Sequence, residues 1–357
     1  MDPAGPQTIL VVKLSALGDV VHALPVVDYL GKVAPGAQVD WVVDRRFAGL
    51  LEGNPGLRRV IPLDLGAWKR EWAAGSSRRD AVSAIRLLRK GGYDAAFDIQ
   101  GNIKSGVVTR LSGAGLRFGF DRSGVRESPN LFFTNRHVRS RPEDVHVTQK
   151  ILRVVNAPFG GEIPSWWTVP GIVTSKAADN EAARLLGELL PDRNPRLAIH
   201  AGTTWNTKKM DPDFWAGVAR LLRDRFPQVG VFLSWGTEEE REEAEGIRRL
   251  AGEGTRVLPR LALRQLAAVY KVCGYMLGPD TGPLHIAAAA GAKTVSLFRA
   301  SDGSRTAPYG PTHRFLQAPM PCTACRRKRC DRDVECRKSI LLEDAAAAMA
   351  QLMGGAP

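Results

Sequence analysis

The feature that constrains the fold most is a repeated alternation of short apolar segments with amphipathic helical segments. Such an alternation is typical of a parallel sheet that carries helices on both faces. We expect strands at TILVVKL (8–14), QVDWVVD (38–44), DAAFDI (94–99), RLAIHAG (196–202), VGVFLSW (229–235), YMLGPD (275–280) and TVSLF (294–298). We expect helices over residues 20–30, 80–90, 176–190, 212–222, 238–245, 283–291 and 340–353.

The chain is long enough for two domains, because it has 357 residues and a domain takes roughly 150. The alternation breaks over NAPFGGEIPSWWTVPG (156–171), whose three prolines and clustered glycines are typical of a linker. We predict two doubly wound α/β domains that face each other across a cleft, residues 1–160 and 173–338, joined by a linker at 161–172. The remaining residues, 339–357, form a helix that could cross back to the first domain.

The charge of the chain is strongly basic. Lys and Arg number 50 against 37 Asp and Glu, which gives a net charge of +13. Residues 101–153 contain ten of these cations and four of the anions. A field of this sign attracts nucleic acid, an anionic membrane surface or a polyanionic substrate. A solvated basic surface explains the composition equally well, and composition alone does not choose among these alternatives.

The N-terminal sequence has no basic segment ahead of its apolar stretch, and no apolar run approaches the ~18 residues that a membrane span needs. We therefore expect a cytoplasmic protein. The chain also lacks a P-loop, a Gly-x-Gly-x-x-Gly motif, a Gly-x-Ser-x-Gly motif and a His-Glu-x-x-His motif. Its two Asp-x-Asp strings, at 211–213 and 331–333, do not follow apolar strands, so we do not expect a metal–diphosphate site on them.

Polar residues follow several predicted strands, where ligands bind in open α/β sheets. Ser15–Asp19 follows the first strand, and Asp19 could serve as a general base or as a helix cap. His200–Thr204, with lysines soon after it, suits a phosphate, as does Gly278–His285 at a helix start. Glutamates of 238–245 could hold a ribose diol, although a solvated face is the alternative for any one of them.

Several motifs occur in the order and spacing of a known family: KLSALGDVVHALP, DIQGNIKS, RFGFDRSGVRE, HAGTT with KK, SWG with EEE, and DTGPLHIAAAAG with TVSLF and PYG. Together they resemble the bacterial ADP-heptose–lipopolysaccharide heptosyltransferases, glycosyltransferase family nine, over about residues 10 to 340. KLSALGD with DIQGNIKS is more similar to heptosyltransferase I than to II. Heptosyltransferase II, or a family member with another acceptor, is the alternative.

The resemblance implies a GT-B fold and an inverting, metal-independent transfer of heptose from ADP-heptose to Kdo-modified lipid A. The first domain would bind the acceptor and the second the nucleotide sugar, at the anionic inner face of the inner membrane and without nucleic acid. Asp19 matches the family's base. The residues that match the donor site are Thr203, Thr204, Lys208, Asp280, Thr281, Gly282, His285 and, for the ribose, Glu240. Gln100, Lys104, Arg122 and Arg126 fall in motifs of the acceptor side, with Lys69 and Arg70 expected on a loop nearby.

Two segments depart from the family pattern. Lys208-Lys209-Met210-Asp211 stands where many relatives have Lys-x-Trp-Pro, so either Lys208 or Lys209 could contact phosphate. Phe298-Arg299-Ala300-Ser301 stands where Phe-Gly-Pro-Thr is usual. We expect Arg299 to add a phosphate contact or to alter the choice of nucleotide.

Four cysteines lie within fifteen residues as Cys322-x2-Cys325-x4-Cys330-x5-Cys336, among seven Lys and Arg residues between 326 and 338. This spacing is close to that of a zinc knuckle. The alternatives are a structural zinc site, reduced or redox-sensitive thiols and, most remotely, a nucleic-acid-binding module. No aromatic stacking platform lies beside the cysteines, which argues against the last.

Overall fold

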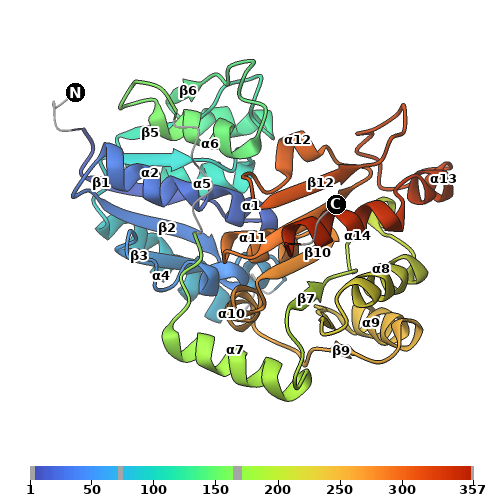
Figure 1. Ribbon diagram of the computed structural model, residues 1–357. Helices are drawn as coiled ribbons and strands as arrows, with labels where there is room; N and C mark the ends of the chain where they lie inside the picture. Colours follow the sequence, from blue (N-terminus) through green and yellow to red (C-terminus); the bar gives the residue numbers. More distant parts are fainter. Residues whose placement is uncertain (1–4, 71–74, 164–170, 355–357) are drawn as a thin grey trace. The chain divides into compact units, whose positions relative to one another are not determined.

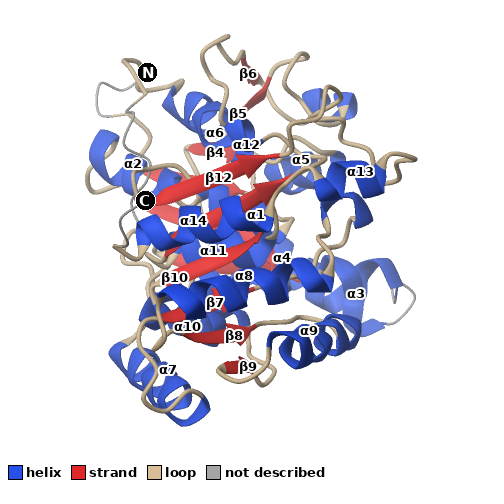
Figure 2. Ribbon diagram, turned by 45° about the vertical axis from the view of Figure 1, so that its right-hand side comes forward, coloured by secondary structure: helices blue, strands red, loops and turns tan. Residues whose placement is uncertain are grey.

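The computed structural model describes residues 5–70, 75–163 and 171–354. The chain divides into two compact units, Met1–Val173 and Thr174–Pro357 (Figure 1). Each unit is a six-stranded sheet whose described strand pairs are all parallel. Helices flank the strands of both sheets (Figure 2), which confirms the predicted doubly wound α/β architecture.

The sheet of the first unit has the strand order β3-β2-β1-β4-β5-β6. Its strands are β1 (Thr8–Val12), β2 (Gln38–Asp44), β3 (Arg59–Leu63), β4 (Ala95–Asp98), β5 (Leu116–Phe120) and β6 (Arg136–Val138). Its helices are α1 (Leu17–Ala23), α2 (Pro25–Val33), α3 (Leu65–Arg70), α4 (Gly75–Lys90), α5 (Ile103–Leu111) and α6 (Val147–Asn156), with 3₁₀ turns η1 (Arg45–Leu50) and η2 (Ser128–Phe132). Leu10 and Val12 of β1 pack with Leu88 of α4 and Val108 of α5 in one apolar core.

The sheet of the second unit has the order β12-β11-β10-β7-β8-β9. Its strands are β7 (Arg196–Ile199), β8 (Gly230–Leu233), β9 (Thr255–Val257), β10 (Tyr275–Pro279), β11 (Lys293–Phe298) and β12 (His313–Gln317). Its helices are α7 (Lys176–Leu189), α8 (Pro212–Arg225), α9 (Glu238–Ala251), α10 (Leu263–Cys273), α11 (Gly282–Ala289), α12 (Gly303–Thr306), α13 (Asp333–Lys338) and α14 (Leu342–Leu352), with a 3₁₀ turn η3 (Asn206–Lys208). Ile199, Trp215, Ile247 and Leu277 belong to its core.

The seven predicted strands are all present, but the sequence pattern did not reveal β3, β5, β6, β9 and β12. Four of these, β3, β6, β9 and β12, lie at sheet edges, where exposed and short strands carry a weak apolar pattern. The predicted helix over residues 20–30 is two helices, α1 and α2. Pro25 is the first residue of α2, and it has no N–H to donate to the turn before it.

The units divide directly after the predicted linker, 161–172, of which residues 164–170 lie outside the described part. The C-terminal helix packs within the second unit, and the expectation that it crosses back to the first domain stays a prediction. Ala345 and Met349 of α14 are buried in the core of the second unit, and Lys293 Nζ donates to the Leu352 carbonyl 3.1 Å away. None of the described helices combines the length and apolarity that crossing a membrane requires.

The burial of α14 generates a stability prediction. Met349 is fully buried, so Met349→Ala should lower the free energy of unfolding of the second unit by about 2–4 kcal/mol through lost contacts and a cavity. Gln351→Ala, on the exposed side of the same helix, is the control and should change it by less than about 0.5 kcal/mol. Thermal unfolding followed by calorimetry measures both, and equal effects of the two substitutions would contradict the packing.

Candidate active site

Both sheets bring two strand ends together at the point where the strand order reverses. In the first unit β1 pairs with β4, and in the second β7 pairs with β10. Connections leave these paired strands in opposite directions along the sheet, so the loops that follow them splay apart and leave a crevice at their carboxyl ends. Most of the predicted site residues follow these four strands.

Asp19 lies in the first turn of α1, directly after β1. Its Oδ2 accepts a hydrogen bond from the Ala16 N–H at 3.3 Å, which caps the helix. The same oxygen is 3.6 Å from Nη1 of Arg126, and about a third of the Asp19 side chain is exposed. The two interpretations of Asp19, helix cap and general base, are therefore compatible: the carboxylate is oriented by the helix start and is still open to solvent.

Arg126 is brought to Asp19 by the loop that follows β5. The N–H groups of Arg126 and Glu127 both donate to the Gly101 carbonyl, at 3.0 Å each. Gly101 has φ +74, and a Cβ there would be 3.3 Å from the Arg126 nitrogen, so the close approach requires glycine. The Arg126 side chain is 64% exposed and can reach an anion in solution.

Three buried polar residues, Gln100, Lys13 and Asp98, form hydrogen bonds to the backbone near the ends of β1 and β4. Oε1 of Gln100 accepts from the Leu14 and Ser15 N–H groups at 3.2 and 3.1 Å, so Gln100 holds the loop before Asp19. Nζ of Lys13 donates to the Ile99 carbonyl at 3.0 Å, and burial lowers the pKa of that amine. Burial also raises the pKa of the Asp98 carboxyl, although the Gly101 N–H and the Asn130 and Ser105 side chains hydrogen-bond to it. Gln100, predicted as an acceptor residue, is thus placed as a support of the loop.

A pocket of about 440 Å³ opens beside the same strand ends, and Ser15, Asp44, Arg46, Lys104 and Glu127 contribute polar groups to its lining. Lys104 therefore lies beside the strand ends of the first unit. The walls carry both charges, which suits a substrate with hydroxyls as well as anionic groups.

Arg122 lies apart from this lining. It is exposed in the turn after β5. Lys69 and Arg70 belong to helix α3 and not to the expected loop, because residues 65–70 form a helix. The side chains of Lys69 and Arg70 lie outside the described part of the chain.

In the second unit, Lys208 of η3 meets Asp280 at the end of β10. Nζ of Lys208 is 2.5 Å from Oδ2 of Asp280, and Nε2 of His285 is 3.0 Å from Oδ1. All three side chains are largely buried. Burial by itself raises the pKa of the Asp280 carboxyl, but the hydrogen bond from His285 and the charge of Lys208 hold that pKa well below its usual range. Asp280 therefore stays ionised and fixes the position of the lysine.

Backbone donors and hydroxyls lie close to this ion pair in the sequence. Thr281 is the N-cap of α11, Gly282 is its first residue and Pro283 follows, as predicted. The Thr281 hydroxyl donates to the Pro279 carbonyl at 3.2 Å. Thr203 is half-buried and Thr204 is exposed in the loop before η3. Hydroxyls, N–H groups at a helix start and a lysine are the groups that bind phosphate.

Glu240 is placed against the loop that follows β7. A Cβ at Gly202 would lie 2.4 Å from Cδ of Glu240, so the carboxyl group packs on the Gly202 backbone. Oε2 of Glu240 accepts from the Gly236 N–H at 2.7 Å and completes a capping box with Thr237. This contact distinguishes Glu240 from the neighbouring glutamates. Lys209, the other lysine candidate, pairs instead with Glu243 at 3.1 Å.

The expectation that Arg299 contacts phosphate is contradicted. Arg299 is 2% exposed. Its guanidinium donates to the Lys209 carbonyl, to the Asp333 carbonyl and to Oδ1 of Asp333, at 2.5, 2.6 and 2.7 Å. A buried cation needs such partners. No sequence pattern pointed to them, because Asp333 lies 34 residues further along the chain.

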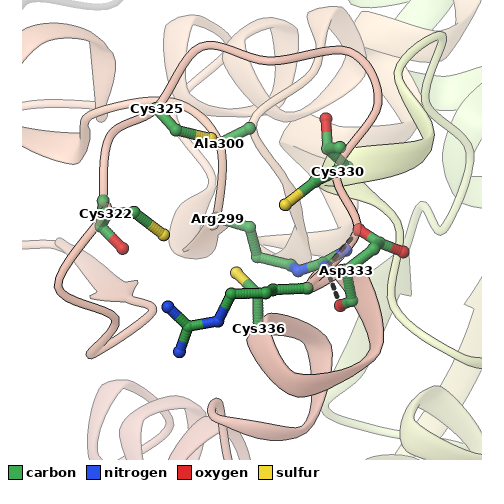
Figure 3. Close-up of a pocket in the computed structure, with 10 residues that line it drawn as sticks. Arg299, Ala300, Cys322, Cys325, Cys330, Asp333 and Cys336 are labelled. Carbon is green, nitrogen blue, oxygen red and sulfur yellow. Dashed lines mark hydrogen bonds and ion pairs between the residues drawn. The ribbon is translucent and has the colours of Figure 1, made fainter.

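The four clustered cysteines line one small pocket together with Arg299, as Figure 3 shows. None of these four cysteines forms a disulfide in the structure. Within the described ranges, no three or more His, Cys, Asp and Glu side chains are arranged to hold a metal ion. The zinc interpretation and the free-thiol interpretation of the cysteines both stay predictions.

Comparison with known proteins identifies a family. The model of glycosyltransferase family 9 (heptosyltransferase) matches residues 81–334, which is more than half of the chain. The lipopolysaccharide heptosyltransferase 1 of Pseudomonas aeruginosa is 33% identical over 90% of this chain and 87% of its own length.

Solved structures share the fold. A structure of E. coli heptosyltransferase WaaC with ADP has a TM-score of 0.77 at 24% identity and covers 96% of this chain and 99% of that one. A second, with ADP-2-deoxy-2-fluoro heptose, has a TM-score of 0.70 at 27% identity and covers 89% and 96%. The predicted GT-B fold is confirmed by this similarity.

The ion pair of Lys208 and Asp280 predicts a pH-dependent stability. Asp280→Asn should cost about 3 kcal/mol of unfolding free energy at pH 7, because a buried lysine loses its carboxylate. The folded-state pKa of Asp280 is depressed, so its stabilisation is complete above the unfolded value of about 4 and is lost as the pH falls toward the folded value. The difference between wild type and variant should therefore shrink between about pH 7 and about pH 3.

Chemical unfolding at the two pH values measures this difference. Asp224→Asn, a change of an exposed carboxylate in the same unit, is the matched control and should have little effect at either pH. If the wild type exceeds Asp280→Asn in unfolding free energy by the same amount at both pH values, the carboxylate of Asp280 does not stabilise the fold through a depressed pKa.

Proposed function

The chain belongs to glycosyltransferase family 9, the heptosyltransferases, and on this premise we propose that it transfers heptose from ADP-heptose to a Kdo residue of the lipopolysaccharide inner core, as a heptosyltransferase I. The similarity to lipopolysaccharide heptosyltransferase 1 over most of the chain supports the assignment. The observation that carries it is chemical: the chain offers an oriented carboxylate, Asp19, after β1 and a buried lysine–carboxylate pair, Lys208 and Asp280, after β7 and β10.

The proposed reaction is a single displacement with inversion at the anomeric carbon. The Asp19 carboxylate takes the proton of the acceptor hydroxyl, and that oxygen forms a bond to the anomeric carbon of the heptose. The bond from the anomeric carbon to the diphosphate oxygen breaks, and its electron pair leaves with ADP. Arg126, whose Nη1 lies 3.6 Å from Oδ2 of Asp19, is exposed enough to meet an anionic acceptor.

The second unit would hold the departing ADP. The ammonium of Lys208 neutralises the charge that grows on the diphosphate, and the N–H groups of Thr281 and Gly282 and the hydroxyls of Thr203 and Thr204 complete the cradle. Asp280 and His285 do not contact the phosphates in this proposal; they orient Lys208. Glu240, beside Gly202, would accept hydrogen bonds from the ribose diol.

The acceptor would bind to the first unit. Lys104 in the pocket lining and Arg126 offer cations for the carboxylates and phosphates of a Kdo–lipid A molecule. The net charge of +13 would also favour the anionic inner face of the membrane, at about 1 kcal/mol for each well-placed cation. Salt-sensitive co-sedimentation with anionic vesicles is the measurement for this association.

Two other functions are the alternatives. Heptosyltransferase II, or transfer to another acceptor, differs only in the product, and mass analysis of products from defined acceptors separates these activities.

A zinc-knuckle protein that binds nucleic acid would show an affinity for RNA or DNA that falls steeply as the salt concentration rises. Zinc analysis of the purified protein distinguishes a four-cysteine site, at one zinc per chain, from free thiols. Neither result bears on transfer, for which we propose no metal.

Removal of the proposed base is the most direct test. Asp19→Asn should lower kcat by about 10²- to 10⁴-fold, the usual contribution of a general base, while the affinity for ADP stays within about twofold. Glu143→Gln is a matched control, because Glu143 lies 3.7 Å from Arg141 on the surface of the same unit. If heptose transfer by Asp19→Asn stays near the wild-type rate, Asp19 is not the base.

The donor assignment predicts a nucleotide preference. A ligand that binds the folded state raises the melting temperature according to its concentration relative to Kd. ADP and ADP-heptose should therefore raise it more than equal concentrations of UDP or GDP in a thermal-shift assay. Lys208→Met should abolish most of the ADP-induced shift. A larger shift with UDP than with ADP would argue against heptose transfer.

A further inference from the structure

The loop around Lys208 and the end of β11 lie in one hydrogen-bonded network with the segment that contains the four clustered cysteines. We call residues 205–211, which contain Lys208, the lysine segment, and residues 320–337, which contain the four cysteines, the cysteine segment. Most side chains of the cysteine segment are exposed or half-buried. Burial of apolar groups therefore contributes little to fixing the position of the cysteine segment. Its polar contacts with the lysine segment and with Arg299 contribute more.

Alternate residues of the lysine segment are held by groups from outside it. The hydroxyl of Thr207, which is 4% exposed, donates to the Arg327 carbonyl at 2.6 Å. The Lys209 carbonyl accepts from Arg299 at 2.5 Å. Arg337 pairs with Asp211 at the start of α8. Lys208, between the first two, projects instead to Asp280.

Arg299 and Asp333 connect these contacts into one network. The Arg299 guanidinium binds the Lys209 carbonyl and Asp333, and Arg337 binds Asp333 at 2.5 Å as well as Asp211. Asp333 is therefore shared by two arginines, one from the end of β11 and one from the cysteine segment. Figure 3 shows Arg299 and Asp333 near the cysteines, joined by dashed lines.

Trp205 adds an aromatic contact between the two segments. Its ring lies 5.1 Å from Nζ of Lys208 and 5.4 Å from Nζ of Lys328, a residue of the cysteine segment. Both distances are within the range of a cation–π interaction. The indole therefore contacts the proposed diphosphate-binding lysine and the cysteine segment at once.

We propose that the cysteine segment, through Thr207 and Arg299, is a positioning element that sets Lys208 for the diphosphate of the nucleotide sugar. The proposal rests on the proposed function, because it takes Lys208 as the diphosphate-binding lysine. Thr207 and Arg299 are positioning residues and do not contact the ligand: Arg299 is buried and its guanidinium is bound to Lys209 and Asp333. Lys209, Asp211 and Arg299 then belong to one network of hydrogen bonds with the cysteine segment.

Fixing a lysine side chain in one position has an entropic cost. A lysine side chain loses about 2 kcal/mol of rotamer freedom when it is fixed. A backbone turn that is already held on both sides of Lys208 leaves only the side chain to be ordered by Asp280 and the diphosphate. Loss of the Thr207 contact would free the turn, and the ligand would then have to order it on binding.

The test compares two Thr207 variants with wild type by ADP titration calorimetry and by steady-state transfer. Thr207→Val removes the hydroxyl with almost no change in shape, and it should raise the Kd for ADP and the KM for the donor by about 3- to 10-fold. The KM for the acceptor should stay within about twofold. Thr207→Ser keeps the hydroxyl and should restore wild-type values.

Thr255→Val is the matched control for the loss of a buried hydroxyl. Thr255 is 1% exposed, and its hydroxyl accepts from Arg223 at 2.7 Å. It belongs to β9, at the opposite edge of the sheet from β12. Both valine variants should lower the melting temperature, but Thr255→Val should leave the ADP affinity within about twofold. Equal ADP affinity of Thr207→Val and wild type would overturn the proposal, as would an equal loss in both valine variants.

A double substitution tests whether the effect runs through Lys208. In the Lys208→Met background, Thr207→Val should change the ADP affinity by less than about twofold, because the group that it positions is gone. If Thr207→Val weakens ADP binding in this background as much as it does in wild type, the proposal is overturned.

Arg337→Gln is a second variant, nearer the surface, that frees Asp211. It should weaken ADP binding by about threefold. If Thr207→Val does not fold and Arg337→Gln binds ADP as tightly as wild type, the positioning role of the cysteine segment is also overturned.

The wild-type protein separates this inference from the proposed function. If wild type binds no ADP and transfers no heptose, the proposed function fails and the positioning role falls with it. If wild type binds ADP and the Thr207 variants bind it equally well, only the positioning role fails.

Discussion

The parallel pairing of β1 with β4 and of β7 with β10 places the loops that carry the candidate site. In each sheet the chain leaves these two neighbours in opposite directions, so two loops separate at the carboxyl ends of buried strands. Asp19 and Gly101 follow one such pair, and Lys208 and Asp280 follow the other. The base and the phosphate-binding groups of the proposed reaction are therefore held on short loops and helix starts that directly follow buried strands.

Charge in these places is stabilised by partners that are distant in sequence. Asp280 remains ionised although it is buried, because Lys208 and His285 both face it. Arg299 is buried among carbonyl groups and Asp333. In each case an isolated buried charge would cost several kcal/mol, and the partners offset part of that cost. This explains why the residues around Lys208 form a connected network.

Much of the architecture could be predicted from the sequence, since buried parallel strands are nearly continuous apolar runs and seven of them were found. Edge strands such as β3 and β6 were missed because one of their sides faces no other strand and their pattern is mixed. Asp19, Lys104, Lys208, Glu240 and Asp280 were identified as candidates from motifs. Two supporting hydrogen bonds, from Arg299 to the Lys209 carbonyl and from the Ser15 N–H to Gln100, could not be predicted. Their partners are 90 and 85 residues apart, whereas a motif describes only residues that are close in the sequence.

The two α/β units, the residue types at the strand ends and the family resemblance can be read from the sequence, because apolar periodicity and turn residues are local properties of the chain. Three further features are set by the folded chain: Arg299 binds the backbone of the lysine segment, α14 completes the second core, and Lys208 rather than Lys209 faces Asp280. These outcomes depend on which distant groups meet after the sheet has formed, and that is set by packing of the whole unit.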